Sequence, residues 1–295
     1  MIQSQLSLLN PSNKLTFLTH ITLLSLILFL LAGTAISSLT FLSSDTGLRY
    51  LQVRELVANE WQTFAVNYPA HFLDLDWKHT PYYHSYSLIN DQLYFNISHI
   101  FPLLTSYLFV GFGSFGLAIF PALGGIVTAV AIYQLGLLLD IKYPNLLLWT
   151  AVFGTPLLIY CLELWDHSMA TACATWGVLG ATKGIKHERW PPLVWGGAAI
   201  GIGLGFRPEM YPFAIALGAA LFVTVWPNWQ RLTAYAGGGI VATLPIWFLQ
   251  YRWVGHPLGL AFAPNLFGYG RPDAYAVEVY NRINTPIVKI GRWLL

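Results

Sequence analysis

Charged residues are scarce in this chain. Of its 295 residues, 9% are Asp, Glu, Lys or Arg, whereas 56% are hydrophobic. A soluble globular domain carries about a quarter charged residues. A chain with so few charges cannot cover its surface with them, so it must be solvated by lipid. The composition therefore predicts a polytopic membrane protein, with membrane lipids as its surroundings.

The chain also lacks an excess of charge of one sign, and it has few cysteines. The 15 basic and 13 acidic residues leave a net charge of +2, and the basic residues are scattered, which argues against a nucleic-acid partner. Cys161 and Cys173 both lie in apolar stretches, at a spacing that matches no metal or redox motif. We expect them to be small core residues.

The first long run without charge extends from Leu15 to Ser44. Because about 20 residues suffice to cross a bilayer, the run predicts a first span over 15–42. A cleaved signal peptide is the alternative, but its apolar region runs to only about 7–15 residues. We expect an uncleaved anchor with the N-terminus in the cytoplasm.

Later apolar runs predict further helices, and their loops give the orientation. Lys183, Lys186 and Arg189 fall in one short loop, which the positive-inside rule places in the cytoplasm. The chain thus reads as one domain (1–295), an all-α transmembrane bundle of about seven spans in a bacterial-type plasma membrane. The first span is followed by an expected external loop over 43–113, which contains interfacial juxtamembrane helices, one of them near 99–110. The chain is expected to end in an external tail over 254–295. The remaining spans are expected within 115–253, at about 115–139, 144–161, 168–182, two in 190–226, and 232–250.

Asp45 is the first acidic residue of the chain, and it directly follows the first span. An amphipathic helix is predicted after it, with Tyr50, Val53 and Trp61 on the apolar face and Arg49 elsewhere on the wheel. Such a helix should lie in the interfacial plane. Asp45 can be interpreted as an ordinary helix N-cap or as a catalytic carboxylate at the water boundary. The two roles do not exclude each other.

Other ionisable residues gather at predicted span ends on the external side. Asp166 and His167 follow one span, while Arg207 and Glu209 interrupt the apolar run 190–226. Ionisable residues close to lipid are costly, so those retained there are functional candidates. The structural alternatives are solvated boundary residues for the first pair and a local ion pair across a turn for the second. The external loop adds further histidines, among them His99.

These pieces resemble the GT-C superfamily of multi-spanning glycosyltransferases, which includes protein O-mannosyltransferases and lipid A aminoarabinose transferases. The resemblance covers about residues 15–260. In this chain Asp45 is followed by Thr46, where many members carry a second acidic residue. The similar segments are Ser44-Asp45-Thr46-Gly47-Leu48-Arg49-Tyr50, the stretch from Asp91 to Leu104 (as a second juxtamembrane helix), Gly154-Thr155-Pro156, Trp165-Asp166-His167 and Gly205-Phe206-Arg207-Pro208-Glu209.

The resemblance implies transfer of a sugar from a polyprenyl-phosphate-linked donor to an acceptor hydroxyl on the extracytoplasmic face. Asp45 is then the expected catalytic base, or the residue that holds a divalent cation if one is used. Arg207 would bind the donor phosphate. The remaining expected substrate-binding residues are Arg49, His99, Asp166, His167 and Glu209.

Two rival interpretations remain. One is a non-enzymatic transporter or flippase of lipid-linked sugars, which should show charged or broken helices at mid-membrane in both halves of the chain. The other is an inactive partner subunit, or a short or truncated member, because the last residues 290–295 look like the start of another apolar segment. Donor sugar, acceptor, metal dependence and oligomeric state are not determined by the sequence.

Overall fold

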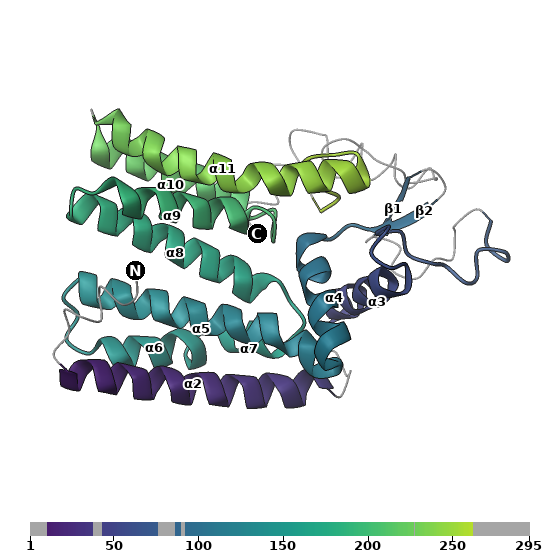
Figure 1. Cartoon of the computed structure of the whole chain (residues 1–295), viewed down its shortest axis with the longest axis horizontal. Helices are drawn as coiled ribbons and strands as arrows, with labels where there is room; N and C mark the ends of the chain where they lie inside the picture. The colour runs from purple at the N-terminus through teal and green to yellow at the C-terminus, as the bar shows by residue number, and fades with distance from the viewer. Residues whose placement is uncertain (1–10, 38–42, 76–85, 90–91, 227, 262–295) are drawn as a thin grey trace, which may run out of the picture.

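The computed structural model describes residues 11–37, 43–75, 86–89, 92–226 and 228–261, and it is predominantly helical. The long helices lie side by side, in the order α2, α5, α8, α9 and α11 across the bundle (Figure 1). Consecutive passes among the long helices run in opposite directions (Figure 1). The bounds are α2 Pro11–Ser37, α5 Ser114–Leu138, α8 His167–Lys186, α9 Trp190–Gly203, α10 Met210–Val225, which packs on α11, and α11 Trp229–Val254.

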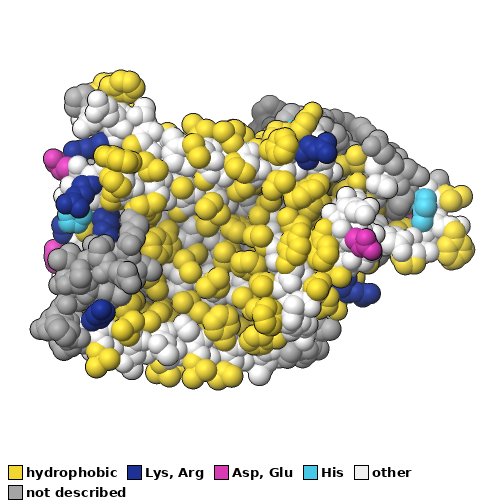
Figure 2. Space-filling view, in the orientation of Figure 1, with side chains coloured by type: hydrophobic (Ala, Val, Ile, Leu, Met, Phe, Trp, Pro, Cys, Tyr) yellow, Lys and Arg dark blue, Asp and Glu magenta, His cyan; other side chains and the backbone are white. Residues whose placement is uncertain are grey.

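Three helices among the described residues are long and apolar enough to cross a membrane: Lys14–Ile36, Ser114–Leu138 and Trp229–Val254. Hydrophobic side chains cover the middle of the bundle, and many Lys and Arg side chains gather at the end where α2 begins (Figure 2). An apolar belt between polar ends is the surface that a bilayer solvates. The chain is therefore a membrane protein with transmembrane helices.

The span expected over 144–161 is not one continuous helix, because the structure divides it into α6 (Pro144–Phe153) and α7 (Leu157–Leu162). Pro156 has no N–H to continue the helix. The side chain of Thr155 takes the place of the missing backbone hydrogen bond. Its Oγ1 donates to the carbonyl of Ala151 (2.7 Å) and accepts the N–H of Leu157 (3.2 Å). With ten residues α6 is about 15 Å long, half the thickness of a bilayer core, so it cannot cross alone.

The segment expected as an external loop over 43–113 contains two short strands as well as helices, in a fold that is otherwise mostly helical. Strand β1 (Tyr86–Ile89) pairs with β2 (Gln92–Phe95) in a two-stranded antiparallel sheet. Its aromatic and aliphatic side chains, including Tyr86 and Phe95, pack against Leu48. The second juxtamembrane helix expected from Asp91 onward is thus partly a strand, and the helix there, α4, spans Ile100–Phe112.

A helix, α3 (Ser44–Ala58), stands where the first juxtamembrane helix is expected, and its buried side includes Val53 of the expected apolar face together with polar residues. Arg49 and Gln52 are buried, because this side of α3 meets polar groups of the bundle rather than lipid. The N-cap is Ser43, whose Oγ accepts the N–H of Thr46 (3.3 Å). Asp45 therefore has no capping role, although it lies in the first turn, where a negative charge suits the helix dipole.

Helices α9 and α11 approach closely through glycine. A Cβ atom on Gly197 would meet the carbonyl of Tyr235, and one on Gly201 would meet the carbonyl of Gly239. Small residues spaced by four allow this backbone contact in membrane helices. Cys161 and Cys173 are both free thiols, and Cys161 is fully buried against Gly125, as expected for a core residue.

Candidate functional site

Three segments far apart in the sequence meet at the end of the bundle where α2 ends. They are the first turns of α3, the turn between α7 and α8, and the turn between α9 and α10 (Figure 1). Their side chains form one connected group, called here the ionic cluster. It consists of Asp45, Arg49, Asp166, Arg207 and Glu209.

Asp166 lies at the centre of the ionic cluster and is 1% exposed. Its Oδ1 and Oδ2 accept hydrogen bonds from Nη2 of Arg49 at 3.1 and 3.0 Å, and Oδ1 also accepts one from Nη1 of Arg207 at 2.9 Å. Burial by itself would raise the pKa of the carboxyl group. The charges of Arg49 and Arg207, with the hydrogen bonds from Arg49, outweigh burial and lower the pKa of Asp166 below its ordinary value. Asp166 is therefore an ionised, permanently paired carboxylate.

Arg49 is the buried cation of the ionic cluster. Its Nη1 donates to the backbone carbonyl of Asp45 at 3.0 Å, while Nη2 holds Asp166. A guanidinium that is 4% exposed and bonded on two sides is fixed in position. Arg49 thus ties α3 to the turn before α8.

Arg207 lies closer to the solvent than Arg49 does, and its side chain is 19% exposed. Its Nε and Nη2 donate to the two carboxylate oxygens of Glu209 at 3.0 and 2.6 Å, in a fork geometry. Glu209 itself is 64% exposed. Arg207 is therefore held between one buried carboxylate, Asp166, and one that is open to solvent.

His167 lies beside Arg207, with its Nδ1 3.1 Å from Nη1 of that residue. A guanidinium only donates hydrogen bonds, so Nδ1 is an acceptor and the ring is neutral. Burial and the charge of Arg207 lower the pKa of His167 to about 4. The ring stacks on Tyr160 (centroids 4.5 Å apart), a neighbour that the sequence did not single out, and packs against Trp165 (4.7 Å).

Asp45 lies at the rim of the ionic cluster. Its carboxylate is 55% exposed, and Oδ2 lies 3.7 Å from Nη1 of Arg49, beyond hydrogen-bonding distance. The position is close to a fixed positive charge but open to solvent. Such a carboxylate is accessible to an incoming hydroxyl group.

A second carboxylate close to this turn was missed at the level of sequence. Glu163 is 5% exposed, and its Oε2 accepts a hydrogen bond from Oγ1 of Thr46 at 2.8 Å. Thr46, the residue after Asp45, thus contacts an acid from another segment of the chain. The available signal was an acidic residue between two leucines at a predicted span end.

His99 belongs to a different environment from the ionic cluster. It is 1% exposed and packs edge-on against Phe64, with ring centroids 4.6 Å apart. Neither ring nitrogen has a hydrogen-bond partner among the described residues, and burial lowers the pKa of His99 to about 4. The hydrogen bonds of the ionic cluster do not include it.

The surroundings of Asp45 can be compared with those of a metal site. Among the residues that the structure describes, no group of three or more His, Cys, Asp or Glu side chains converges to hold one. The nearby carboxylates of Asp166 and Glu209 are already neutralised by guanidinium groups. The side chains of the ionic cluster are thus positioned by one another.

Comparison of the chain with protein-family models, with curated proteins and with solved structures found no match.

Proposed function

We propose that the chain is an integral-membrane glycosyltransferase of GT-C type, with about seven spans and a cytoplasmic N-terminus. It would transfer a sugar from a polyprenyl-phosphate donor to an acceptor hydroxyl on the extracytoplasmic face. The observation that carries the proposal is the arrangement of Arg207 and Asp45. A partly exposed guanidinium and an exposed carboxylate lie at the same end of the bundle, linked through buried Asp166 and Arg49.

The chemistry requires a base and a stabilised leaving group. The acceptor hydroxyl gives its proton to the carboxylate of Asp45 as its oxygen forms a bond to the anomeric carbon of the sugar. The bond from that carbon to the phosphate oxygen breaks, and the polyprenyl phosphate leaves with the electron pair. Arg207 neutralises the charge that develops on the phosphate, which is the role of a preorganised cation. Arg49 and Asp166 hold the carboxylate of Asp45 and the guanidinium of Arg207 in position relative to each other.

Arg207 must be released from one partner to bind a phosphate. Its bond to Asp166 is buried, whereas its bond to Glu209 is open to solvent. Breaking an exposed ion pair costs about 0–1 kcal/mol, much less than breaking a buried one. We therefore assign Glu209 as the residue that the donor phosphate displaces, while Asp166 keeps Arg207 in place.

The test is sugar transfer by the purified full-length chain in lipid vesicles. The donor is a polyprenyl-phosphate sugar labelled in the sugar, presented with a panel of lipid, glycan and peptide hydroxyl acceptors, and released polyprenyl phosphate is measured. A general base contributes about 10²–10⁴-fold, so Asp45→Asn should lower kcat by at least about 10²-fold with little change in KM. Glu60→Gln, an exposed acid just after α3, is the matched control and should keep full activity.

Undiminished transfer by Asp45→Asn would remove the assigned base. The orientation is tested separately with a cysteine placed at exposed Glu60, which a membrane-impermeant maleimide should label in intact cells. Labelling only after the membrane is opened would place this end in the cytoplasm and defeat the external site. Movement of intact donor across the vesicle membrane without release of polyprenyl phosphate would support the rival transporter, and a chain active only with a second subunit would support the rival partner role.

A further inference from the structure

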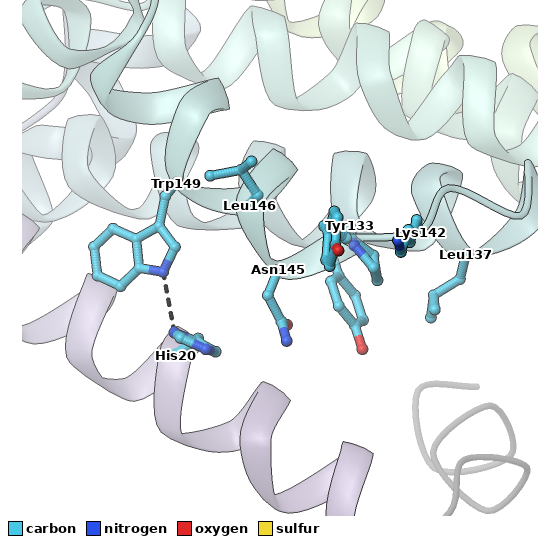
Figure 3. A pocket seen from close by; sticks show the side chains of 9 residues that line it. His20, Tyr133, Leu137, Lys142, Asn145, Leu146 and Trp149 are labelled. Atoms are coloured by element: carbon cyan, nitrogen blue, oxygen red, sulfur yellow. Dashed lines mark hydrogen bonds between the residues drawn. The ribbon is translucent and has the colours of Figure 1, made fainter.

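A cavity of about 480 Å³ lies at the opposite end of the bundle from the ionic cluster. It is an open pocket lined by residues of α2, α5, α6 and the turn between α5 and α6 (Figure 3). Its volume falls within the range of about 300–1,000 Å³ that small-molecule sites occupy. The lining residues are His20, Tyr133, Leu137, Lys142, Tyr143, Pro144, Asn145, Leu146 and Trp149.

The charge of the lining favours an anion. Among the described residues that line it, Lys142 is the single charged side chain besides the titratable His20, and none is acidic. The nearest acid in sequence, Asp140, pairs instead with Lys186 at 3.4 Å. Lys142 is held by an aromatic contact, with its Nζ 5.1 Å from the centre of the Tyr143 ring. The N-terminus of α6, which has no side-chain cap, adds a positive dipole end on the same wall.

Polar groups further inside have hydrogen-bonding capacity to spare. The indole N–H of Trp149 donates to Nδ1 of His20 at 3.1 Å (Figure 3). Since Nδ1 is the acceptor, the proton of the ring lies on Nε2, which is left as a donor. Oδ1 of Asn145 is buried and has no hydrogen-bond partner among the described residues. A buried polar atom without a partner is costly, and a ligand hydroxyl group would satisfy it.

The depth of the cavity indicates that the ligand is a lipid. His20 lies six residues after Lys14 in α2, which is about 9 Å along the helix toward the apolar belt. Leu137 and Leu146 form apolar walls beside the polar groups. A site that is cationic at the mouth and apolar along its walls, at the edge of the belt, matches a phosphate headgroup with the start of its acyl chains. Basic pockets between transmembrane helices bind anionic headgroups in this way.

We propose that this cavity binds an anionic glycerophospholipid whose headgroup carries hydroxyl groups, with the phosphate at Lys142 and a headgroup hydroxyl at Asn145. The proposal does not depend on the glycosyltransferase assignment, because it concerns the other end of the molecule. Phosphatidylglycerol has this chemistry. Phosphatidylcholine has the same phosphodiester without net charge or headgroup hydroxyls, and inorganic phosphate has the anion without the lipid.

The test is native mass spectrometry of the full-length chain in detergent, titrated with each of these three probes. Phosphatidylglycerol should bind about fivefold more tightly than phosphatidylcholine, the effect of about one lysine near an anionic headgroup. Lys142→Gln should abolish this preference. Asn145→Leu should weaken phosphatidylglycerol binding about two- to tenfold, the range of one hydrogen bond.

Lys14→Gln is the matched control, because Lys14 is an exposed lysine at the same end that does not line the cavity. It should keep the preference, and an equal loss in both lysine variants would reduce the effect to surface charge and overturn the site. Displacement of phosphatidylglycerol by equimolar inorganic phosphate would overturn the lipid assignment. Leu146→Trp, which fills the cavity from its apolar wall without changing charge, should abolish binding while the thermal midpoint stays unchanged, and retained binding would contradict the proposal.

Discussion

Nη2 of Arg49 lies 3.1 and 3.0 Å from the two carboxylate oxygens of Asp166, although 117 residues separate the two positions in the chain. Both side chains are buried, at 4% and 1% exposure. The bond joins the juxtamembrane helix α3 to the helical bundle. It also fixes the carboxylate that holds Arg207, so the stability of the fold and the geometry of the candidate site share one contact.

Asp166→Asn should destabilise the protein strongly. Removing one partner of a buried ion pair leaves the other charge uncompensated, which costs about 3–5 kcal/mol. Thermal midpoints in detergent measure the effect. Asp140→Asn is the control, because Asp140 forms an exposed pair with Lys186, and that change should cost less than about 1 kcal/mol. Equal effects of the two substitutions would show that the Arg49–Asp166 bond does not hold α3.

Glu209→Gln should strengthen donor binding if the proposed function holds. Without the negative charge of Glu209, Arg207 keeps Asp166 but loses its solvent-exposed competitor for phosphate. We expect the KM for the polyprenyl-phosphate donor to fall by about twofold to fivefold, the equivalent of a surface ion pair worth less than 1 kcal/mol. A KM that rises instead would indicate that Glu209 itself contacts the donor, as the sequence resemblance implied. Glu60→Gln should leave the KM unchanged.

Stability should fall as the pH drops from about 6.5 to about 4. In the folded protein the pKa values of His99 and His167 are lowered from 6.5 to about 4, for both mainly by burial. Between these values the unfolded chain takes up protons that the folded chain does not, so stability present above pH 6.5 is lost as the pH falls toward 4. Thermal midpoints between pH 8 and pH 4 test this.

His99→Phe should flatten that pH profile, because the ring packs against Phe64 and makes no hydrogen bond among the described residues. His187→Gln, a change at an exposed position at the opposite end, should leave the profile as it is. A profile that His99→Phe does not alter would exclude His99 as a source of the pH dependence.

Two adjacent glycines of α11 should respond in opposite ways to alanine. A Cβ atom on Gly238 would collide with the carbonyl of Val194 in α9, whereas one on Gly237 would meet nothing within 4 Å. Gly238→Ala should destabilise the protein by about 1–3 kcal/mol through overpacking. Gly237→Ala should be neutral or stabilise it by up to about 1 kcal/mol, because alanine favours the helix. Thermal midpoints decide, and two equal shifts would contradict the close approach of α9 and α11.

The gathering of the candidate residues at one end could be predicted because it depends only on the lengths of apolar runs and the placing of charges between them. Those features located Asp45, Asp166 and Arg207 near the same end, and the helix α3 after the first span. The rotation of α3 about its axis could not be predicted. An isolated amphipathic helix turns its apolar face to lipid, but Arg49 gains more from a buried carboxylate that lies elsewhere in the sequence.

Other features depend on equally non-local or short signals. The break at Gly154–Pro156 occupies three residues in an otherwise apolar run, and the strands Tyr86–Ile89 and Gln92–Phe95 pack on Leu48, which lies far from them in the sequence. The partnership of Thr46 with Glu163 spans 117 positions. The hydrophobic periodicity of the sequence does not predict such pairs, because each pair depends on which helix ends become neighbours in the fold.

The docking of α3 also sets an order of events during synthesis. Arg49 emerges from the ribosome 117 residues before Asp166. At a synthesis rate of roughly 5–20 residues per second, Asp166 is made about 6–23 s after Arg49. Until the turn before α8 has been made, the guanidinium of Arg49 has no buried carboxylate to pair with, so we expect it to stay solvated. The end of the bundle that carries the ionic cluster is therefore assembled only after the turn before α8 has been made.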